Sequence, residues 1–128
     1  WANFCQDVAR DWDKGRVYLP QATLRRHGVD DATFAARRAT SEFRAALAEE
    51  VARADNFLRR GAPLVERLPP DLAIDVDLFV RGGLAILEAV RRVDYDVWTR
   101  RPEVSKGRKL WLLCQTCSQR LTRAFRRS

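Results

Sequence analysis

The chain has 128 residues, of which 46% are hydrophobic and 32% charged, and its formal net charge is +7. This composition excludes a disordered chain, and no apolar run approaches the ~20 residues that span a membrane. The positive charge favours an anionic partner, either a nucleic acid, an anionic lipid or a phosphorylated substrate, without choosing among them. Because the chain starts at Trp1 and contains no Met, we expect it to be part of a longer polypeptide.

Hydrophobic periodicity predicts an all-α chain with no strand pattern and no internal repeat. Proline and glycine mark the breaks between helices, because proline fixes its own φ and pushes the preceding residue out of the helical region. Gly61 and Pro63 are expected to kink or split one long helix. In chain order, we expect helices over residues 1–12, 20–28 and 31–37, a long helix from residue 41, and then helices over 72–99 and 105–126.

Residues that favour helix N-termini precede several of these segments. Asp30 or Asp31 is expected to cap the third helix, Thr40 or Ser41 the long helix, and Ser105 the last one. The long helix also carries an apolar stripe at helical spacing, which should face the core. The stripe consists of Phe43, Leu47, Val51, Ala54 and Leu58.

Two adjacent glycines, Gly82 and Gly83, lie in the middle of the helix predicted over 72–99. Each costs roughly 1 kcal/mol of helix stability relative to Ala. A helix that carries this cost indicates either close packing against a neighbouring helix or room for a ligand.

The cysteines are too few for a disulfide framework and favour a reducing compartment. Cys114 and Cys117 form a lone C-x-x-C, and a zinc site would need two more ligands although His27 is the only histidine. The apolar residues around this pair indicate buried helical thiols. We interpret His27 as a cap at a helix C-terminus rather than a ligand.

Asn3, Asp7 and Asp11 lie at positions i, i+4 and i+8 of the first predicted helix. Four residues turn a helix by about 400°, so the three side chains share one face within about 12 Å along the axis. Oxygen donors at this spacing suit Mg²⁺, a hard ion that keeps several waters and is usually shared with substrate phosphates. The alternative is a solvated acidic face, which Arg10 and Lys14 would neutralise.

The residues after this helix add cations and a flexible position. Arg16 has the forked geometry that grips a diphosphate, and Gly15 would let the loop close over the site. Tyr18 would present its ring or its hydroxyl to the same region. The alternatives are an ion pair of Arg16 with Asp11 or Asp13, and a packing role for Tyr18.

Two blocks of the sequence carry a distinctive order of residues. The first is N-x-x-x-D-x-x-x-D over residues 3–11, followed by G-R-V-Y-L-P over residues 15–20. The second runs from R-G-G over residues 81–83, through Y-D at 95–96, to R-R-P-E-V-S-K over residues 100–106. The first block resembles the second aspartate-rich motif and flap of squalene and phytoene synthases, and the second resembles the last two helices of that family. The segment between them fits only in its helix layout.

The resemblance implies a single-domain α-helical isoprenoid synthase bundle around an apolar cavity, of which residues 1–128 form the C-terminal part. By match to the motif, Asn3, Asp7 and Asp11 would ligate Mg²⁺. Asp7, Asp11 and Tyr18 would take part in catalysis, and Arg16 and Arg100 would bind the diphosphate of a prenyl diphosphate substrate. The choice between Arg100 and Arg101 stays open. The family's first aspartate-rich motif is not in the chain, so we expect the fragment alone to be inactive.

The R-G-G and R-R-P-x-V-S-K motifs most resemble those of hydroxysqualene synthases of hopanoid biosynthesis. That branch would ionise presqualene diphosphate, and water would capture the cation. Squalene, presqualene diphosphate or phytoene synthesis by head-to-head prenyl transfer is the alternative. Many family members carry a tyrosine in the penultimate helix at the position that alignment gives to Gly83, so their condensation mechanism does not transfer directly.

The charge also raises two non-enzymatic functions. The sequence has no helix-turn-helix motif and no basic helix with residues that would contact base edges, so no nucleic-acid partner is expected. The last predicted helix is basic and amphipathic, so peripheral membrane association is an alternative to core packing. We expect a cytoplasmic protein, peripheral at the inner membrane face if this helix binds lipid, with other enzymes of the pathway as further partners. The residues concerned are Leu110, Trp111, Leu113, Arg120, Leu121, Arg123, Phe125, Arg126 and Arg127.

Overall fold

The computed structural model describes residues 1–108, 110–112, 114–115 and 118. Over these residues the chain contains helices and no strand, which confirms the all-α prediction. The elements are α1 (Ala2–Gln6), α2 (Val8–Asp13), α3 (Gln21–Arg26), α4 (Asp31–Ala36), α5 (Ser41–Gly61), the 3₁₀ helix η1 (Ala62–Arg67) and α6 (Pro70–Arg92).

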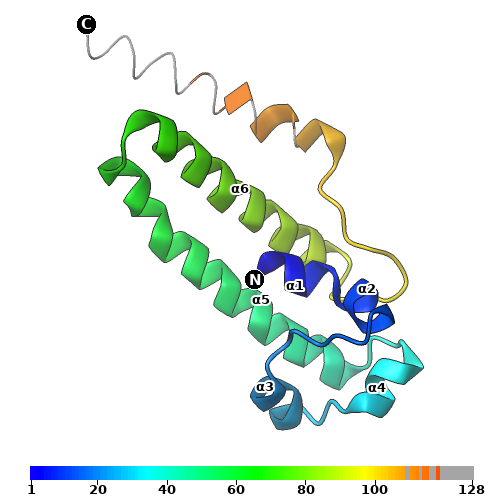
Figure 1. Cartoon of the computed structure of the whole chain (residues 1–128). Coiled ribbons are helices and arrows are strands. Elements are labelled where there is room, and N and C mark those ends of the chain that lie inside the picture. Colours follow the sequence, from blue (N-terminus) through cyan, green and yellow to red (C-terminus); the bar gives the residue numbers. More distant parts are fainter. Residues whose placement is uncertain (109, 113, 116–117, 119–128) are drawn as a thin grey trace, which may run out of the picture.

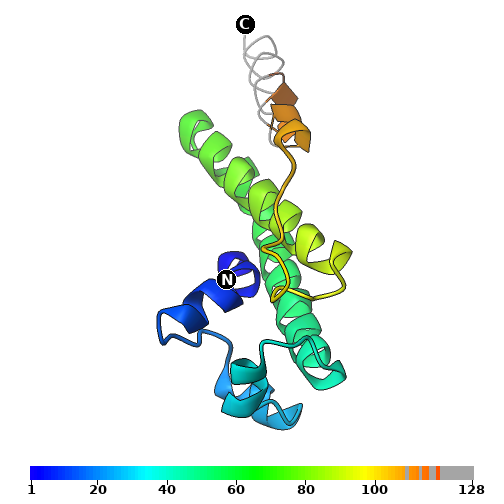
Figure 2. The same ribbon diagram turned by 90° about the vertical axis from the view of Figure 1, so that its right-hand side faces the viewer.

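The two long helices α5 and α6 form an antiparallel hairpin with η1 at its tip (Figure 1). Helix α1 packs against both of them, and α3 packs against α5 at the end of the hairpin away from the tip. The view in Figure 2 shows α1 and α2 together on one side of the hairpin. The segment after α6 runs back along that helix, where Arg81 Nη1 donates to Gln115 Oε1 at 2.8 Å.

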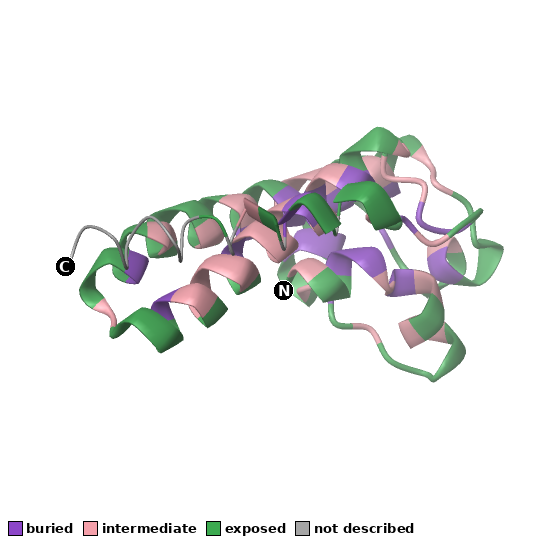
Figure 3. Ribbon diagram, turned by 90° about the horizontal axis from the view of Figure 1, so that it is seen from above, coloured by how far each residue is buried: buried purple, intermediate pink, exposed green. Residues whose placement is uncertain are grey.

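The core lies where α1, α3 and α4 meet α5 and the second half of α6, and the hairpin tip is largely exposed (Figure 3). Aromatic rings from three segments meet there, with Trp98 in contact with both Phe34 and Phe43. The largest fully buried apolar side chains are Phe34, Phe43, Leu47, Leu87, Val51, Val90 and Val97. One continuous core therefore supports the helices that carry the predicted ligands.

The predicted caps and stripe are confirmed. Asp30 caps α4 by accepting from the backbone N–H of Thr33 at 2.9 Å. Thr40 caps α5 by accepting from the backbone N–H of Phe43 at 3.2 Å. Of the stripe residues of α5, the first four are buried and Leu58 packs against the core.

The two glycines of α6 have different surroundings. A Cβ at Gly83 would lie 2.8 Å from Cδ1 of Leu58, so α5 and α6 approach closely at this position. A Cβ at Gly82 would meet nothing within 4 Å. Both interpretations of the glycine pair thus apply, one to each residue: close packing at Gly83 and open space at Gly82.

An ion pair also joins the hairpin. Asp55 on α5 lies 2.6 Å from Arg59 Nε and 3.3 Å from Nη1 of Arg91 on α6. The hydrogen bond from Arg59, supported by that from Arg91, holds the pKa of Asp55 below its ordinary value. The carboxylate is therefore stabilised in its charged form by the folded arrangement of the two helices.

The prediction of one continuous helix over residues 1–12 is wrong. The helix is divided at Asp7, whose φ of −101° and ψ of 15° depart from helical values, into α1 and α2. The hydrogen bonds from Asp7 N–H to the Asn3 carbonyl and from Asp11 N–H to the Asp7 carbonyl, both 2.8 Å, cross the division. The break therefore bends the backbone without shifting the register of the residues on either side.

The helix predicted over 72–99 starts at Pro70 and ends at Arg92. Asp94 and Tyr95 have positive φ values of 50° and 59°, which no continuing helix allows. The turn directs Val97 and Trp98 into the core, where both are buried. Burial of a large aromatic ring outweighs the local preference for more helix, and periodicity alone could not show this.

The last predicted helix starts as expected, since Ser105 Oγ accepts from the backbone N–H of Arg108 at 3.2 Å. Cys114 is exposed, so its predicted burial is wrong: the apolar neighbours Leu110 and Trp111 are exposed as well and form no core around the thiol. Leu110 and Trp111 are exposed, and Arg108 stacks on the Trp111 ring at 5.0 Å. The remaining residues of the predicted amphipathic face, and Cys117, lie outside the described residues. None of the described helices is long and apolar enough to cross a membrane.

His27 follows α3 as its C-cap residue, as predicted. Its Nε2 lies 2.8 Å from Glu49 Oε2 on α5. The contact ties the end of α3 to the long helix, which is a structural role rather than a ligand's.

Candidate active site

The predicted ligands Asn3, Asp7 and Asp11 form one column along α1 and α2. Each is joined to the next by a backbone hydrogen bond of 2.8 Å, so the i, i+4, i+8 register survives the break at Asp7. Asn3 is exposed, whereas Asp7 and Asp11 are half-buried. The side chains of Asn3, Asp7 and Asp11 therefore extend from one side of α1 and α2, and solvent reaches all three.

Asp7 forms an ion pair with Arg101, which lies in the segment after α6. Arg101 Nε lies 2.6 Å from Asp7 Oδ1, and Arg101 Nη2 lies 3.2 Å from Oδ2. This two-point contact is the geometry that favours guanidinium over ammonium. The hydrogen bond with Asp7 raises the pKa of Arg101 above its ordinary value.

Gln6 completes the contact between α1 and the segment after α6. It is buried, and its Nε2 donates to the Pro102 carbonyl at 2.6 Å. Its Oε1 accepts from Arg101 Nη2 at 3.0 Å. The Arg101–Pro102 segment is thereby fixed against α1.

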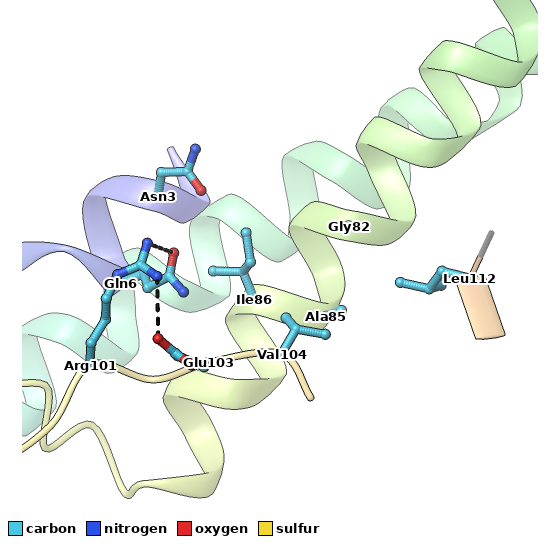
Figure 4. A pocket seen from close by; sticks show the side chains of 9 residues that line it. All are labelled: Asn3, Gln6, Gly82, Ala85, Ile86, Arg101, Glu103, Val104 and Leu112. Atoms are coloured by element: carbon cyan, nitrogen blue, oxygen red, sulfur yellow. Dashed lines mark hydrogen bonds and ion pairs between the residues drawn. The ribbon is translucent and has the colours of Figure 1, made fainter. Parts of the chain in front are cut away.

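A cavity of about 280 Å³ opens beside this contact (Figure 4). Its polar end is formed by Asn3, Gln6, Arg101 and Glu103, which lie close to one another in the view. Its apolar part is lined by Gly82, Ala85, Ile86, Val104 and Leu112. A molecule with an anionic head and an apolar tail matches this distribution of side chains.

A second, small hollow lies at the other end of the column. Asp11, Arg16 and Tyr18 line it together, and the Tyr18 ring stacks on Phe4 with centroids 4.4 Å apart. Gly15 has a φ of +68°, which allows the sharp turn between α2 and the flap. Arg16 and Tyr18 therefore lie beside Asp11, the last of the three predicted ligands.

Comparison with known proteins identifies the family. The profile of the squalene/phytoene synthase family matches residues 1–108. The chain belongs to the squalene/phytoene synthase family.

Relatives include the chloroplastic phytoene synthase 3 of Zea mays, 34% identical over 111 residues, which cover 87% of this chain and 26% of that protein. The phytoene synthase of Rhodobacter capsulatus is 33% identical over 116 residues, covering 90% of this chain and 34% of that protein. Among solved structures, the squalene synthase HpnC from Alicyclobacillus acidocaldarius matches with a TM-score of 0.70 and 42% identity, over 73% of this chain and 36% of that one. The chain thus spans about a quarter to a third of the relatives it matches.

The surroundings of Arg16 and Tyr18 distinguish an ion pair from a free guanidinium and a packing role from a place in the hollow. Asp13 pairs with Arg37 on the helix end opposite, and Arg16 makes no ion pair with another described residue. Arg16 is exposed and lines the hollow together with Asp11. The ion-pair alternative for Arg16 therefore finds no support here, whereas Tyr18 both packs on Phe4 and lines the hollow.

The two adjacent arginines of the second family block are placed differently. Arg100 is exposed, whereas Arg101 is half-buried, binds Asp7 and lines the cavity. The predicted diphosphate contact of Arg100 stays a prediction. Sequence reasoning missed Gln6, because no local pattern indicates that a glutamine will meet residues 95 and 96 positions away.

The donor chemistry of the column fits Mg²⁺. All three side chains offer oxygen, and the Asp7 carboxylate has free lone pairs even while it accepts from Arg101. Within the described ranges, no group of three or more His, Cys, Asp and Glu side chains comes together to hold a metal ion. Two carboxylates and one amide suit an ion that completes its shell with water and phosphate oxygens.

Proposed function

We propose that the protein carrying this chain is a Mg²⁺-dependent prenyl-diphosphate enzyme that ionises presqualene diphosphate to give hydroxysqualene. The observation that carries the proposal is the column of Asn3, Asp7 and Asp11 beside a cavity that is polar at one end and apolar at the other. The match to the squalene synthase from Alicyclobacillus acidocaldarius at 42% identity, against 34% for the phytoene synthase of Zea mays, favours squalene-type over phytoene-type chemistry. Squalene, presqualene diphosphate or phytoene synthesis is the alternative.

In this proposal Asn3, Asp7 and Asp11 hold the metal. When bound, Mg²⁺ would offset the negative charge that develops on the leaving diphosphate. Arg16 adds a forked donor set from the flap, and Arg100 a second one from the segment after α6. These groups bind the diphosphate and keep it away from the cation that its departure leaves behind.

The cavity would hold part of an isoprenoid chain. Gly82, Ala85 and Ile86 provide its apolar wall, which excludes water along the hydrocarbon. Asn3 and Arg101 at the other end would provide hydrogen-bonding partners for the water that captures the cation. The proton that this water loses would pass to the released diphosphate. Tyr18 would close the flap over the site through its stack on Phe4.

The test is product analysis on the full-length protein with presqualene diphosphate and Mg²⁺. Asp7→Asn removes a proposed ligand, and Asp13→Asn is the matched control, since Asp13 lies on the same helix pair but pairs with Arg37 instead. We expect hydroxysqualene from the unmodified protein and from Asp13→Asn, and none from Asp7→Asn. Turnover of farnesyl or geranylgeranyl diphosphate in place of presqualene diphosphate would overturn the assignment to the hydroxysqualene synthase branch. No turnover of any of the three would overturn the function.

A cytoplasmic location and peripheral contact with the inner membrane face belong to the same proposal. The exposed Leu110 and Trp111, with Arg108 stacked beside them, are compatible with a lipid surface. Pelleting with anionic liposomes tests this contact, and recovery of the protein only in the supernatant would exclude it.

A further inference from the structure

Gln6 is a buried polar side chain directly before the ligand Asp7, and its exposed fraction is only 5%. Both ends of its amide are occupied by one distant segment: Nε2 donates to the Pro102 carbonyl at 2.6 Å, and Oε1 accepts from Arg101 Nη2 at 3.0 Å. Pro102 is itself fully buried. A buried amide bonded at both ends has one orientation. Gln6 therefore holds both the backbone next to Arg101, through the Pro102 carbonyl, and the direction of the Arg101 guanidinium.

The guanidinium of Arg101 passes this orientation on to Asp7. Its Nη2 is shared between Gln6 Oε1 and Asp7 Oδ2, and its Nε binds Asp7 Oδ1 at 2.6 Å. The donors of a guanidinium are fixed relative to one another in a plane. A guanidinium that satisfies Gln6 therefore also sets the plane in which the Asp7 carboxylate can be bound.

Asp7 depends on such support because of its place in the backbone. It is the residue at which α1 ends and α2 begins, with φ −101° and ψ 15°. A residue inside a continuous helix has its side-chain direction set by the regular backbone, whereas a residue at a junction has not. Within the described part of the chain, the hydrogen bonds and the ion pair of the Asp7 side chain are all with Arg101.

We propose that Gln6 is a positioning residue for the metal-binding carboxylate of Asp7, and that it acts through Arg101. Gln6 itself is not a ligand in this arrangement, since its oxygen and one of its N–H groups are taken by residues 101 and 102. The inference rests on the proposed function, because it requires Asp7 to bind the metal. Loss of Gln6 should therefore weaken metal binding while the ligand column itself remains complete.

The experiment is a Mn²⁺ titration of the full-length protein in the presence of inorganic pyrophosphate, with free Mn²⁺ measured by electron paramagnetic resonance. Gln6→Met keeps the length of the side chain and removes both hydrogen bonds. The control is Thr23→Val, which removes another buried hydrogen bond, that to Glu50 at 2.5 Å, between α3 and α5, neither of which carries Asn3, Asp7 or Asp11. Loss of an outer partner of a metal ligand typically weakens metal affinity about 10- to 100-fold, so we expect about tenfold for Gln6→Met and less than about twofold for Thr23→Val.

A double-mutant cycle tests the route through Arg101. If Gln6 acts only through the guanidinium, Gln6→Met combined with Arg101→Lys should lose no more Mn²⁺ affinity than Arg101→Lys alone. Losses that multiply would overturn the route, and unchanged Mn²⁺ affinity in folded Gln6→Met would overturn the positioning role. Gln6→Asn, which keeps the amide but shortens its reach, carries the same expectations if Gln6→Met does not fold. Failure of the unmodified protein to bind Mn²⁺ with pyrophosphate would instead overturn the proposed metal site, and the positioning role with it.

Discussion

The adjacent glycines of α6 offer a stability measurement with its own internal control. Alanine at either position gains about 1 kcal/mol of helix propensity. At Gly82 the new methyl group would meet nothing within 4 Å, so we expect Gly82→Ala to raise the free energy of unfolding by about that 1 kcal/mol. At Gly83 the methyl group would lie 2.8 Å from Leu58 Cδ1, the end of a half-buried side chain that can turn aside, so we expect a cost at the lower end of the about 1–3 kcal/mol typical of overpacking.

The difference between the two variants cancels the propensity gain. Gly83→Ala should therefore be less stable than Gly82→Ala by about 1 kcal/mol, measured by urea unfolding with far-UV circular dichroism as the signal. A cycle with Leu58→Ala adds a second check, because removing Cδ1 should abolish most of the penalty at Gly83. Equal free energies of unfolding for the two glycine variants would show that the Leu58 side chain turns aside without cost, and the reasoning would fail.

Three further outcomes follow from buried or charged groups elsewhere. Thr23→Val removes the hydrogen bond to the fully buried Glu50, and urea unfolding should show a loss of about 1–3 kcal/mol; an unchanged midpoint would mean that Glu50 finds another partner. Burial raises the pKa of the Cys5 thiol to about 12, so a thiol reagent at neutral pH should modify the exposed Cys114 and leave Cys5 intact, as peptide mapping by mass spectrometry would show. Hydrogen bonds from two arginines hold the pKa of Asp55 below its ordinary value, so its contribution to stability is present above that ordinary value and lost as the pH falls through the lowered one; Asp55→Asn should therefore flatten the acid side of the stability profile.

Local chemistry explains why the common register of the three oxygen-bearing residues was predictable. A residue and its partner four positions away are joined by one helical hydrogen bond, so their relation depends on helix formation and not on what packs against it. The spacing of Asn3, Asp7 and Asp11 is of this kind, and it survived a break in the helix. The caps Asp30 and Thr40 are equally local, since each binds an N–H three residues ahead.

The stripe of α5 shows the same principle at the level of packing. Phe43, Leu47 and Val51 recur at helical spacing, and burial of one face is the main source of stability for such a helix. The sequence could therefore show that this face is buried. It could not show that Gly83 of α6 would be the residue that lets Leu58 approach.

Sequence by itself thus determined the helical class, the order of the helices, their caps and the register of the oxygen donors, because all of these depend on residues a few positions apart. Tertiary structure alone decided where α6 ends, since burial of Trp98 in a core built by α4 and α5 outweighs further helix. It alone also brought Arg101 to Asp7 across 94 positions and buried Gln6 between them. Such contacts depend on how whole helices pack, and no local preference of the chain encodes which side chains will meet.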